Sequence, residues 1–333
     1  MSKVVFFEIE KWEEGFVKKS LNDPHIEFTG DKLTLESVQS YSDAEIISIF
    51  IYSNITKDLI DKLPNLKLIT TRSMGYDHID INYCKQKGIK VAYVPQYGAH
   101  TVAEHTFALI LAISRKIVPS VERSRSGQFG NEGLEGFDLW GKTFGLVGTG
   151  HIGKNVAELA MCFGMKILAY NRHEDTDLAA KGVKFVSLDE LLLGSDIVSL
   201  HLPHTKETEH IINMTNLSKF KKGAILINTA RGALIETAAI AQGLEQGIFS
   251  GVGLDVLEEE ADLREERELL STDYLKKVDL KTQLLNHVLL TQPDVIITPH
   301  NAFNSKEALQ EILTTTIANI KGYSENSPLN LIE

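Results

Sequence analysis

Thr143-Phe144-Gly145-Leu146-Val147-Gly148-Thr149-Gly150-His151-Ile152-Gly153 is the stretch of the chain that decides the fold. A short apolar run of strand length leads directly into three glycines, and a helical pattern continues to Ala160. In a strand–turn–helix unit with this spacing, the first glycine permits a tight turn, the second lets a pyrophosphate approach the backbone, and the third allows close helix packing. The helix N-terminus presents unpaired amides to the phosphates. The stretch predicts a dinucleotide-binding site with these candidate residues: Gly148, Gly150, His151, Ile152 and Gly153.

Apolar runs of strand length recur on both sides of this motif, with helical patterns such as Lys57–Leu63 and Ile81–Lys87 between them. Because parallel strands need crossover helices, the alternation predicts an α/β fold with two doubly wound parallel-sheet domains. The expected strands are Val4–Ile9, Ile46–Ile51, Leu68–Thr71 and Lys90–Val94 in a first series, and Thr143–Val147, Lys166–Tyr170, Ile197–Leu200, Ala224–Asn228, Gly251–Leu254 and Val295–Thr298 in a second.

The chain is expected to return to its first domain at the end. A helical pattern from about Ser305 to Tyr323 follows the last strand of the second series, so it can pack on the first. We therefore expect a discontinuous domain of residues 1–99 and 301–333, and a cofactor domain of residues 100–300. Thr101–Lys116 has too few polar positions for a solvated helix and should be buried between domains or subunits. The stretch Glu258–Gln292 is longer than a connection needs and is interpreted as an insertion at the cleft edge.

Composition excludes several classes of partner. The 333 residues carry a formal net charge of −11, which repels nucleic-acid phosphates and anionic lipid. No apolar run is long enough to span a bilayer, and the N-terminus resembles a strand rather than a signal peptide. The two cysteines, Cys84 and Cys162, are far apart and support neither a disulfide nor a metal cluster, so we expect buried thiols in a reducing compartment. A cytoplasmic protein with a small diffusible substrate and no metal is the expectation.

The end of the second strand of the cofactor domain should decide between the two nicotinamide dinucleotides. An acidic residue there would bind the ribose hydroxyls of NAD, but Asn171-Arg172 follows Tyr170 instead. An arginine suits a 2′-phosphate, so we expect NADP preference or dual use of NAD and NADP. The alternative is that Asn171 binds the ribose, Arg172 is solvated, and Glu174 or Asp175 reaches back.

Two polar residues follow buried strands of the second series and are candidates for catalysis. Arg231 comes after Ala224–Asn228, at a strand's carboxyl end, where ligands bind in open sheets, and its guanidinium can hold a carboxylate through two parallel bonds. His300 reaches the same edge after Val295–Thr298 and can carry a proton near neutral pH.

An acidic residue that hydrogen-bonds the His300 imidazole would favour its protonated form, and spacing alone leaves Glu258, Glu259 and Glu260 as rivals. The remaining histidines that we considered are interpreted as core residues: His78, His105, His201, His204, His210 and His287.

These motifs together resemble the D-isomer-specific 2-hydroxyacid dehydrogenases over nearly the whole chain. The resemblance runs from Thr71–Asp80 through the glycine loop, Asn228–Gly232 and Gly253–Glu260 to Pro299–Phe303. It is greatest to the D-lactate dehydrogenase branch, on Val94–Tyr97, on Phe303 after the histidine, and on the longer segment before His300. The family fold implies a Rossmann-type cofactor domain and a flavodoxin-like substrate domain, and its members imply a homodimer through the cofactor domain.

The resemblance also implies a role for individual residues. Arg231 would bind and polarise the 2-oxo acid, His300 would donate the proton, and Glu260, five positions after Asp255, would tune His300. The substrate-binding residues that it implies are Met74, Gly75, Tyr97 and Phe303. The cofactor-binding residues that it adds are Pro203, Thr229 and Asp255. One departure is Asn171, which stands where the family has an acidic residue and puts strict NAD dependence in doubt.

The activity implied is reduction of a small, pyruvate-like 2-oxo acid to the D-2-hydroxy acid by NAD(P)H. An NADPH-dependent hydroxypyruvate or glyoxylate reductase is the alternative, because of Asn171-Arg172. A third hypothesis, from another class, is a cofactor-sensing protein that resembles the corepressors of this family and acts through partner contacts.

Overall fold

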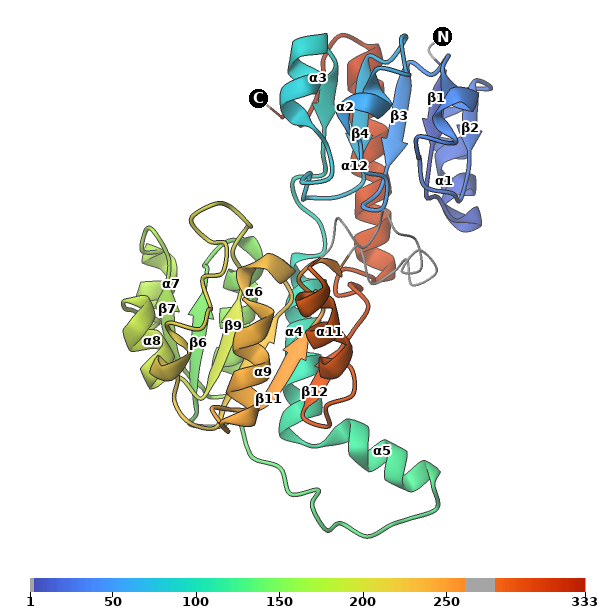
Figure 1. Ribbon diagram of the computed structural model, residues 1–333. Helices are drawn as coiled ribbons and strands as arrows, with labels where there is room; N and C mark the ends of the chain where they lie inside the picture. The colour runs from blue at the N-terminus through green and yellow to red at the C-terminus, as the bar shows by residue number, and fades with distance from the viewer. Residues whose placement is uncertain (1–2, 261–278, 333) are drawn as a thin grey trace. The chain divides into compact units, whose positions relative to one another are not determined.

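Parallel sheets form the framework of the computed structural model, which describes residues 3–260 and 279–332. The chain divides into two compact units: Met1–Gly98 with Ser305–Glu333, and Ala99–Asn304 (Figure 1). Each unit holds one sheet, and every strand pairing in both sheets is parallel. The predicted fold class is confirmed. The assignment of residues 1–99 with 301–333 and of 100–300 to substrate and cofactor remains a prediction.

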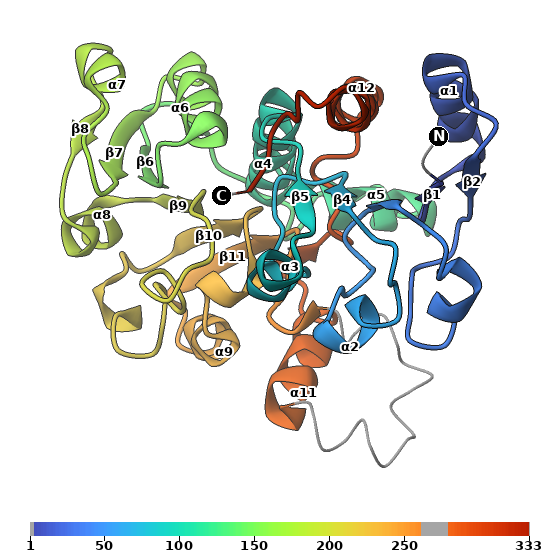
Figure 2. The ribbon, with the colours of Figure 1, turned by 90° about the horizontal axis from the view of Figure 1, so that it is seen from above.

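The first unit contains a five-stranded sheet in the order β2-β1-β3-β4-β5, which is the flavodoxin-like order. Helices α1 and α12 cover one face and α2 and α3 the other (Figure 2). The elements are β1 (Val4–Phe6), α1 (Lys11–Leu21), β2 (Ile26–Phe28), β3 (Ile46–Ile49), α2 (Lys57–Ile60), β4 (Leu68–Thr71), α3 (Ile81–Lys87), β5 (Lys90–Ala92) and α12 (Lys306–Ser324).

Helix α12 shows why the end of the chain belongs to the first unit. Its Leu313, Ile317 and Ile320 are buried in one cluster with Val4 and Leu68 of the sheet. Burial of one such side chain contributes about 1.5–3 kcal/mol, so the helix is bound firmly to the sheet.

The second unit contains a seven-stranded sheet in the order β12-β11-β10-β9-β6-β7-β8, a dinucleotide-binding order extended by one strand. Helices α4 and α6 cover one face, and α8 and α9 the other (Figure 2). The strands are β6 (Thr143–Val147), β7 (Lys166–Tyr170), β8 (Lys184–Phe185), β9 (Ile197–Leu200), β10 (Ala224–Asn228), β11 (Phe249–Leu254) and β12 (Val295–Ile297). The helices are α4 (Ala99–Ser114), α5 (Ile117–Arg125), α6 (His151–Cys162), α7 (Thr176–Ala180), α8 (Leu188–Gly194), α9 (Thr237–Glu245) and α11 (Leu280–Leu289).

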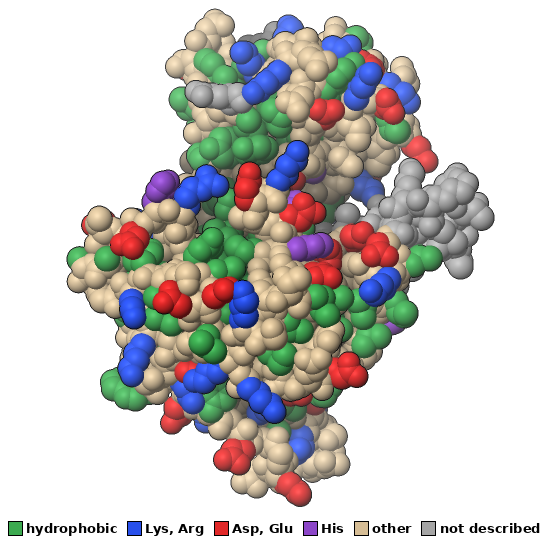
Figure 3. All heavy atoms as spheres, turned by 60° about the vertical axis from the view of Figure 1, so that its left-hand side comes forward, with side chains coloured by type: hydrophobic (Ala, Val, Ile, Leu, Met, Phe, Trp, Pro, Cys, Tyr) green, Lys and Arg blue, Asp and Glu red, His purple; other side chains and the backbone are tan. Residues whose placement is uncertain are grey.

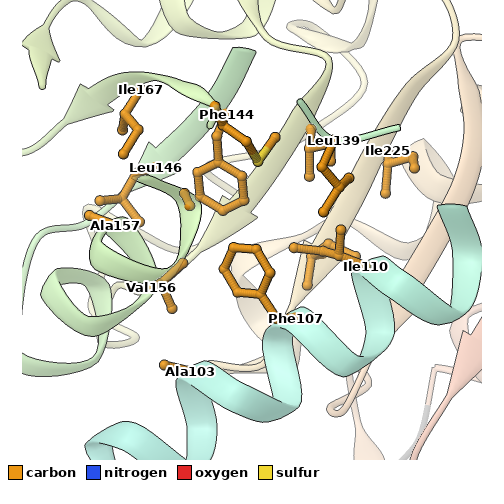
Figure 4. Close-up of a cluster of buried hydrophobic side chains, with 14 of the residues drawn as sticks. Ala103, Phe107, Ile110, Leu139, Phe144, Leu146, Val156, Ala157, Ile167 and Ile225 are labelled. Atoms are coloured by element: carbon orange, nitrogen blue, oxygen red, sulfur yellow. The ribbon is translucent and has the colours of Figure 1, made fainter. Parts of the chain in front are cut away.

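Helix α4 occupies the core of this second unit (Figure 4). Phe107 stacks on Phe144 of β6 with ring centroids 6.1 Å apart, and Ile110 is fully buried in the same cluster. The apolar composition of Thr101–Lys116 therefore has its explanation inside the unit, and the expectation of burial between domains or subunits is not needed to account for it.

Other expectations about single residues differ from the structure. Cys84 is buried as predicted, whereas Cys162 is exposed because it lies at the outer end of α6. His287 is also exposed, on α11, so its interpretation as a core histidine is wrong. Of the proposed insertion Glu258–Gln292, residues 261–278 lie outside the described part of the chain, and α11 forms most of the remainder.

Charged side chains of both signs are mixed over the face in Figure 3, and neither sign gathers there into a large patch. Many are paired at the surface, as Lys181 is with Glu158 at 2.6 Å and Lys219 with Asp189 at 2.6 Å. Exposed pairs of this kind stabilise a fold by about 0–1 kcal/mol each. Within the described residues no helix is long and apolar enough to cross a membrane, and no cluster of His, Cys, Asp or Glu could hold a metal ion.

Candidate active site

The glycine loop connects β6 to α6 as the sequence predicts, and its shape depends on missing side chains. Gly148 has a φ of +101°, and a Cβ there would lie 2.6 Å from the carbonyl oxygen of His201. A Cβ on Gly153 would lie 2.2 Å from the carbonyl oxygen of Gly148, so α6 can start this close to the strand only with glycine. Nothing lies within 4 Å of a Cβ built on Gly150, so the space over the helix start is open.

Two features at this loop fit the phosphates of a dinucleotide. Gly150 is the N-cap residue of α6, and no side chain caps the helix there. Thr149 is buried, and its Oγ1 has no hydrogen-bond partner among the described residues. A phosphate oxygen is an acceptor that both the helix amides and this hydroxyl can bind.

The end of β7 carries the residues expected to face the adenosine ribose. The Asn171 amide donates to the carbonyl oxygen of His173 at 3.0 Å. Asp175 pairs with Lys154 of α6 at 2.6 Å and accepts two amides at the start of α7. The Lys154 ammonium and the amide of Leu178 hold the pKa of Asp175 below its usual range. The carboxylate of Asp175 is therefore engaged by Lys154 and by the first amides of α7.

Arg172 is exposed, and its charge contributes to the lowered pKa of Glu207, which the Thr205 hydroxyl lowers most. Glu207 belongs to the loop after β9 that contains Pro203. The structure thus brings together, at one corner of the second unit, the two segments predicted to surround the adenosine.

His201 follows β9 and adjoins the glycine loop, because its amide donates to the carbonyl oxygen of Val147 at 2.7 Å. Burial lowers its pKa to about 3, so the ring is neutral at physiological pH, and its Nε2 lies 2.8 Å from the Ser199 hydroxyl. Its interpretation as a core residue agrees with this environment. The Nε2 atom of His204, three positions on, is buried without a hydrogen-bond partner in the described part of the chain.

Arg231 follows β10 in a turn that Asn228 holds. The Asn228 side chain accepts from the Ala230 amide at 3.0 Å and donates to the Arg231 carbonyl oxygen at 2.8 Å. Next to the arginine, Thr229 shares a 3.0 Å hydrogen bond with Thr106 of α4. The backbone that carries the Arg231 guanidinium is therefore fixed from both sides.

His300 and Glu260 form a pair: His300 Nδ1 lies 3.0 and 3.2 Å from the two carboxylate oxygens of Glu260. Their side chains are 26% and 20% exposed, so the pair is reachable from solvent yet partly desolvated. The structure thus gives His300 the acidic neighbour Glu260, as the family resemblance implies, and not Glu258 or Glu259. Because Nδ1 faces the carboxylate, Nε2 is the ring nitrogen directed elsewhere.

Asp255 organises the backbone that carries His300. Its carboxylate accepts from the amides of Asn301 at 3.0 Å and Ala302 at 2.8 Å, and from the Thr298 hydroxyl. His300 itself has a φ of +52°, a left-handed conformation that costs about 1–3 kcal/mol outside glycine and persists only where its surroundings hold it. Asp255 is 1% exposed, and both of its carboxylate oxygens are engaged in this turn.

One further histidine supports this turn, and no local sequence pattern predicts that role. His105 of α4 binds the Thr298 hydroxyl at 3.0 Å and lies 3.6 Å from Asp255. Its partners are 193 and 150 positions away, so only the folded sheet edge identifies it. The core interpretation of His105 is therefore incomplete.

The predicted substrate residues of the first unit lie in the loops after β4 and β5. Arg72, buried at the end of β4, donates to two carbonyl oxygens just beyond β1, both at 2.8 Å. The Ser73 hydroxyl donates to the Gly75 carbonyl oxygen at 2.6 Å, so the Met74–Gly75 turn is held in a defined conformation. Tyr97 follows β5 in the same unit, whereas Phe303 lies in the second unit, three residues after His300.

Known proteins resemble this chain over almost all of its length. The sequence model of the D-isomer specific 2-hydroxyacid dehydrogenase NAD-binding domain matches residues 107–302. A D-lactate dehydrogenase from Aquifex aeolicus, solved with NAD and lactic acid, is 38% identical with a TM-score of 0.86, over 97% of this chain and 96% of that one. The pyruvate reductase of Chlamydomonas reinhardtii is 34% identical with a TM-score of 0.89, over 99% and 98%.

A hydroxypyruvate reductase from Thermotoga maritima is 35% identical over 294 residues, 88% of this chain and 89% of that protein. The matched regions include both units and every loop at the carboxyl edge of the second sheet. The chain therefore belongs to the D-isomer-specific 2-hydroxyacid dehydrogenase family and carries that family's NAD-binding domain.

Proposed function

We propose that the protein reduces a small, pyruvate-like 2-oxo acid to the D-2-hydroxy acid with a reduced nicotinamide dinucleotide. The observation that carries this proposal is the His300–Glu260 pair, with 3.0 Å between Nδ1 and Oε2, at the sheet edge that also bears the glycine loop and Arg231. The names of the relatives described above refer to lactate, pyruvate or hydroxypyruvate, which agrees with a 2-oxo acid substrate.

In this proposal the loop Gly148–Gly153 holds the pyrophosphate through the amides at the start of α6, and Thr149 donates its buried hydroxyl. Thr229, Asp255, Pro203 and the residues after β7 complete the cofactor site. When bound, the reduced nicotinamide supplies a hydride to C2 of the acid.

The chain's own residues then bind the acid and supply the proton. Arg231 binds the substrate through charge-assisted hydrogen bonds and stabilises the negative charge that develops on the carbonyl oxygen. His300 donates a proton to that oxygen from Nε2, and Glu260 holds the ring through Nδ1. Amides of Met74 and Gly75 bind the substrate carboxylate, while Tyr97 and Phe303 shape the pocket for its side chain.

We further propose NADP preference or dual use of NAD and NADP. Asn171 places no carboxylate at the end of β7, Asp175 is engaged by Lys154 at 2.6 Å, and Arg172 is exposed and can pair with a 2′-phosphate. An NADPH-dependent reductase of hydroxypyruvate or glyoxylate is the second candidate, favoured by the Thermotoga maritima relative.

The homodimer expected from the family stays a proposal, supported by an exposed apolar arm in the second unit. Helix α5 and the loop after it extend away from the sheet (Figure 1). The arm exposes large apolar side chains: Ile117 at 49%, Val121 at 41%, Phe129 at 86% and Trp140 at 78%. Exposed apolar side chains gathered in one segment are typical of a protein–protein contact, and a second copy is the partner we propose. The cytoplasmic location stays a prediction from the sequence.

The test is the initial rate of cofactor oxidation by the purified protein with pyruvate, hydroxypyruvate, glyoxylate and a branched 2-oxo acid, each with NADH and with NADPH. Arg231→Ala should lose nearly all turnover, and Arg231→Lys, which keeps the charge without the two-pronged geometry, should retain only part of it. Tight cofactor binding without turnover for any pair would instead support the cofactor-sensing protein.

A further inference from the structure

A second histidine–carboxylate pair lies two residues away from Glu260. His210 Nε2 is 2.5 Å from Oε1 of Glu258, and the two side chains are 38% and 16% exposed. The backbone of His210 is anchored independently, because its amide donates to the Ala233 carbonyl oxygen at 2.8 Å and its own carbonyl oxygen accepts from Asn213 at 2.8 Å. The imidazole can therefore be replaced without removing what holds this loop.

The other oxygen of Glu258 is also engaged. Oε2 accepts from the Thr237 amide at 3.0 Å and from its hydroxyl at 2.7 Å, at the start of α9. The carboxylate thus bridges the loop after β9 and helix α9, and each of its two oxygens has a separate donor.

Helix α11, which packs against α9, also holds the backbone of the same segment. The buried Asn286 side chain donates to the Glu258 carbonyl oxygen at 2.8 Å, and Gln283 donates to the Glu259 carbonyl oxygen at 3.2 Å. A Cβ on Gly232 would lie 2.0 Å from the Leu257 carbonyl oxygen, so the segment also packs directly against the residue after Arg231.

The segment that these contacts hold contains a residue with an unfavourable backbone conformation. Glu259 has a φ of +55°, a left-handed conformation that is unfavourable for glutamate by about 1–2 kcal/mol. The turn at Glu259 separates Glu258, which faces His210, from Glu260, which lies 3.0 Å from His300. Such a strained residue persists only when neighbouring contacts fix it, and these include the Gln283 bond to its own carbonyl oxygen and the side-chain contacts of Glu258.

We propose that His210 and Glu258 are positioning residues that hold the turn at Glu259, so that Glu260 stays beside His300. The proposal deepens the proposed function and rests on it, because the role of Glu260 is to hold the proton donor. It differs from a purely structural reading, in which the Glu258 carboxylate serves only to cap α9.

The test compares His210→Gln with His210→Met, two side chains of nearly equal length that differ in the N–H donor. His210→Met should lower kcat for pyruvate reduction about tenfold, because a hydrogen bond to a charged group is lost, while KM for pyruvate and for NADH stay within about twofold. His210→Gln should restore most of kcat. In a Glu260→Gln background His210→Met should lower kcat by less than about twofold, since both changes act through one contact.

A second readout does not depend on turnover. The ¹⁵N resonances of the His300 ring, assigned with His300→Ala, should shift in His210→Met and not in His210→Gln. Exposed His287 of α11 provides the matched control, and His287→Met should change neither kcat nor the His300 resonances.

Equal losses of kcat in His210→Gln and His210→Met, or an undiminished tenfold loss in the Glu260→Gln background, would overturn the proposal. If the wild-type protein reduces no 2-oxo acid, the proposed function fails, and the His300 resonances still decide whether His210 holds Glu260 in place. Unshifted His300 resonances in folded His210→Met would refute the positioning role in either case.

Discussion

The glycine loop and the corner around His300 lie at the carboxyl edge of the same seven-stranded sheet, yet they are built in opposite ways. The loop is contiguous: Gly148 and Gly153 are five positions apart, and the backbone of Gly148 leaves no room for a Cβ on Gly153. The His300 corner is assembled from Glu260, Asp255, Thr298 and His105, which are up to 195 positions from His300. A motif of the first kind can be recognised in a sequence, whereas the second exists only after folding.

The two regions also hold their backbones differently. At the loop the absence of side chains at Gly148 and Gly153 creates the space, so a Cβ at either position would disturb it. At the corner a left-handed histidine is held by the paired acceptors of Asp255. We therefore expect the loop to respond mainly in cofactor binding and the corner mainly in the rate of the chemical step.

The largest effect should come from removing the proton donor at the corner. His300→Ala should lower kcat for pyruvate reduction by about 10²–10⁴-fold, the usual contribution of a positioned acid, while NADH binding measured by fluorescence titration stays nearly unchanged. His287→Ala, on the exposed face of α11, is the matched control and should keep full activity. Near-normal turnover of His300→Ala across the pH range would show that His300 is not the acid.

The second-largest effect should come from Asp255, which supports the His300 corner from a distant position in the sequence. Asp255→Asn keeps the size of the side chain but directs an amide at donors that need an acceptor. We expect kcat to fall about 10–100-fold and the unfolding free energy in urea to drop by about 1–3 kcal/mol. Asp294→Asn, which removes a half-exposed surface partner of Lys116, should cost at most about 1 kcal/mol. Equal effects of the two substitutions would contradict the role of Asp255.

Substitution in the glycine loop should change cofactor binding rather than kcat. Gly153→Ala places a Cβ 2.2 Å from the Gly148 carbonyl oxygen, and the overpacking of about 1–3 kcal/mol should raise the Kd for NADH roughly tenfold. At saturating cofactor kcat should stay within a few-fold of wild type. Gly15→Ala in α1, where a Cβ meets nothing within 4 Å, is the control and should leave NADH binding unchanged. A loss confined to kcat would contradict the expected difference between the two regions.

The smallest effect concerns His201, next to the glycine loop, and the pH dependence of the protein's stability. Burial lowers the pKa of His201 to about 3, against about 6.5 in the unfolded chain. Between these values the unfolded chain binds the extra proton, so this residue's contribution is complete above about pH 6.5 and is lost as the pH falls towards 3. In calorimetry from pH 7 to pH 5, His201→Gln should lose less Tm than wild type, by about 3 °C. Parallel Tm curves would show that His201 does not titrate in this way.

The sequence predicted the long, uniformly apolar elements well. Strands β6, β7, β9 and β10 have the expected bounds, because each is a mostly apolar run of four or five residues followed by a turn signal. Two strands were missed. Strand β8 has two residues, and β2 has three with an exposed Glu27 at its centre, so neither shows a burial pattern long enough to detect.

The site was predictable to the extent that its residues follow strands. Arg231, His300 and the glycine loop come directly after apolar runs, and their positions follow from the topology alone. The choice of Glu260 over its neighbours needed the family resemblance, since the turn at Glu259 leaves no mark in the sequence. The roles of His105 and of the His210–Glu258 pair could not be predicted, because their partners come from distant elements.

The most direct test of the account is the configuration of the product. The purified protein is incubated with pyruvate and NADH or NADPH, and the lactate formed is separated by chiral chromatography. The account predicts D-lactate, formed by the wild-type protein and not by Arg231→Ala. Formation of L-lactate would contradict it. So would a failure to reduce pyruvate or any of the three other 2-oxo acids with either cofactor.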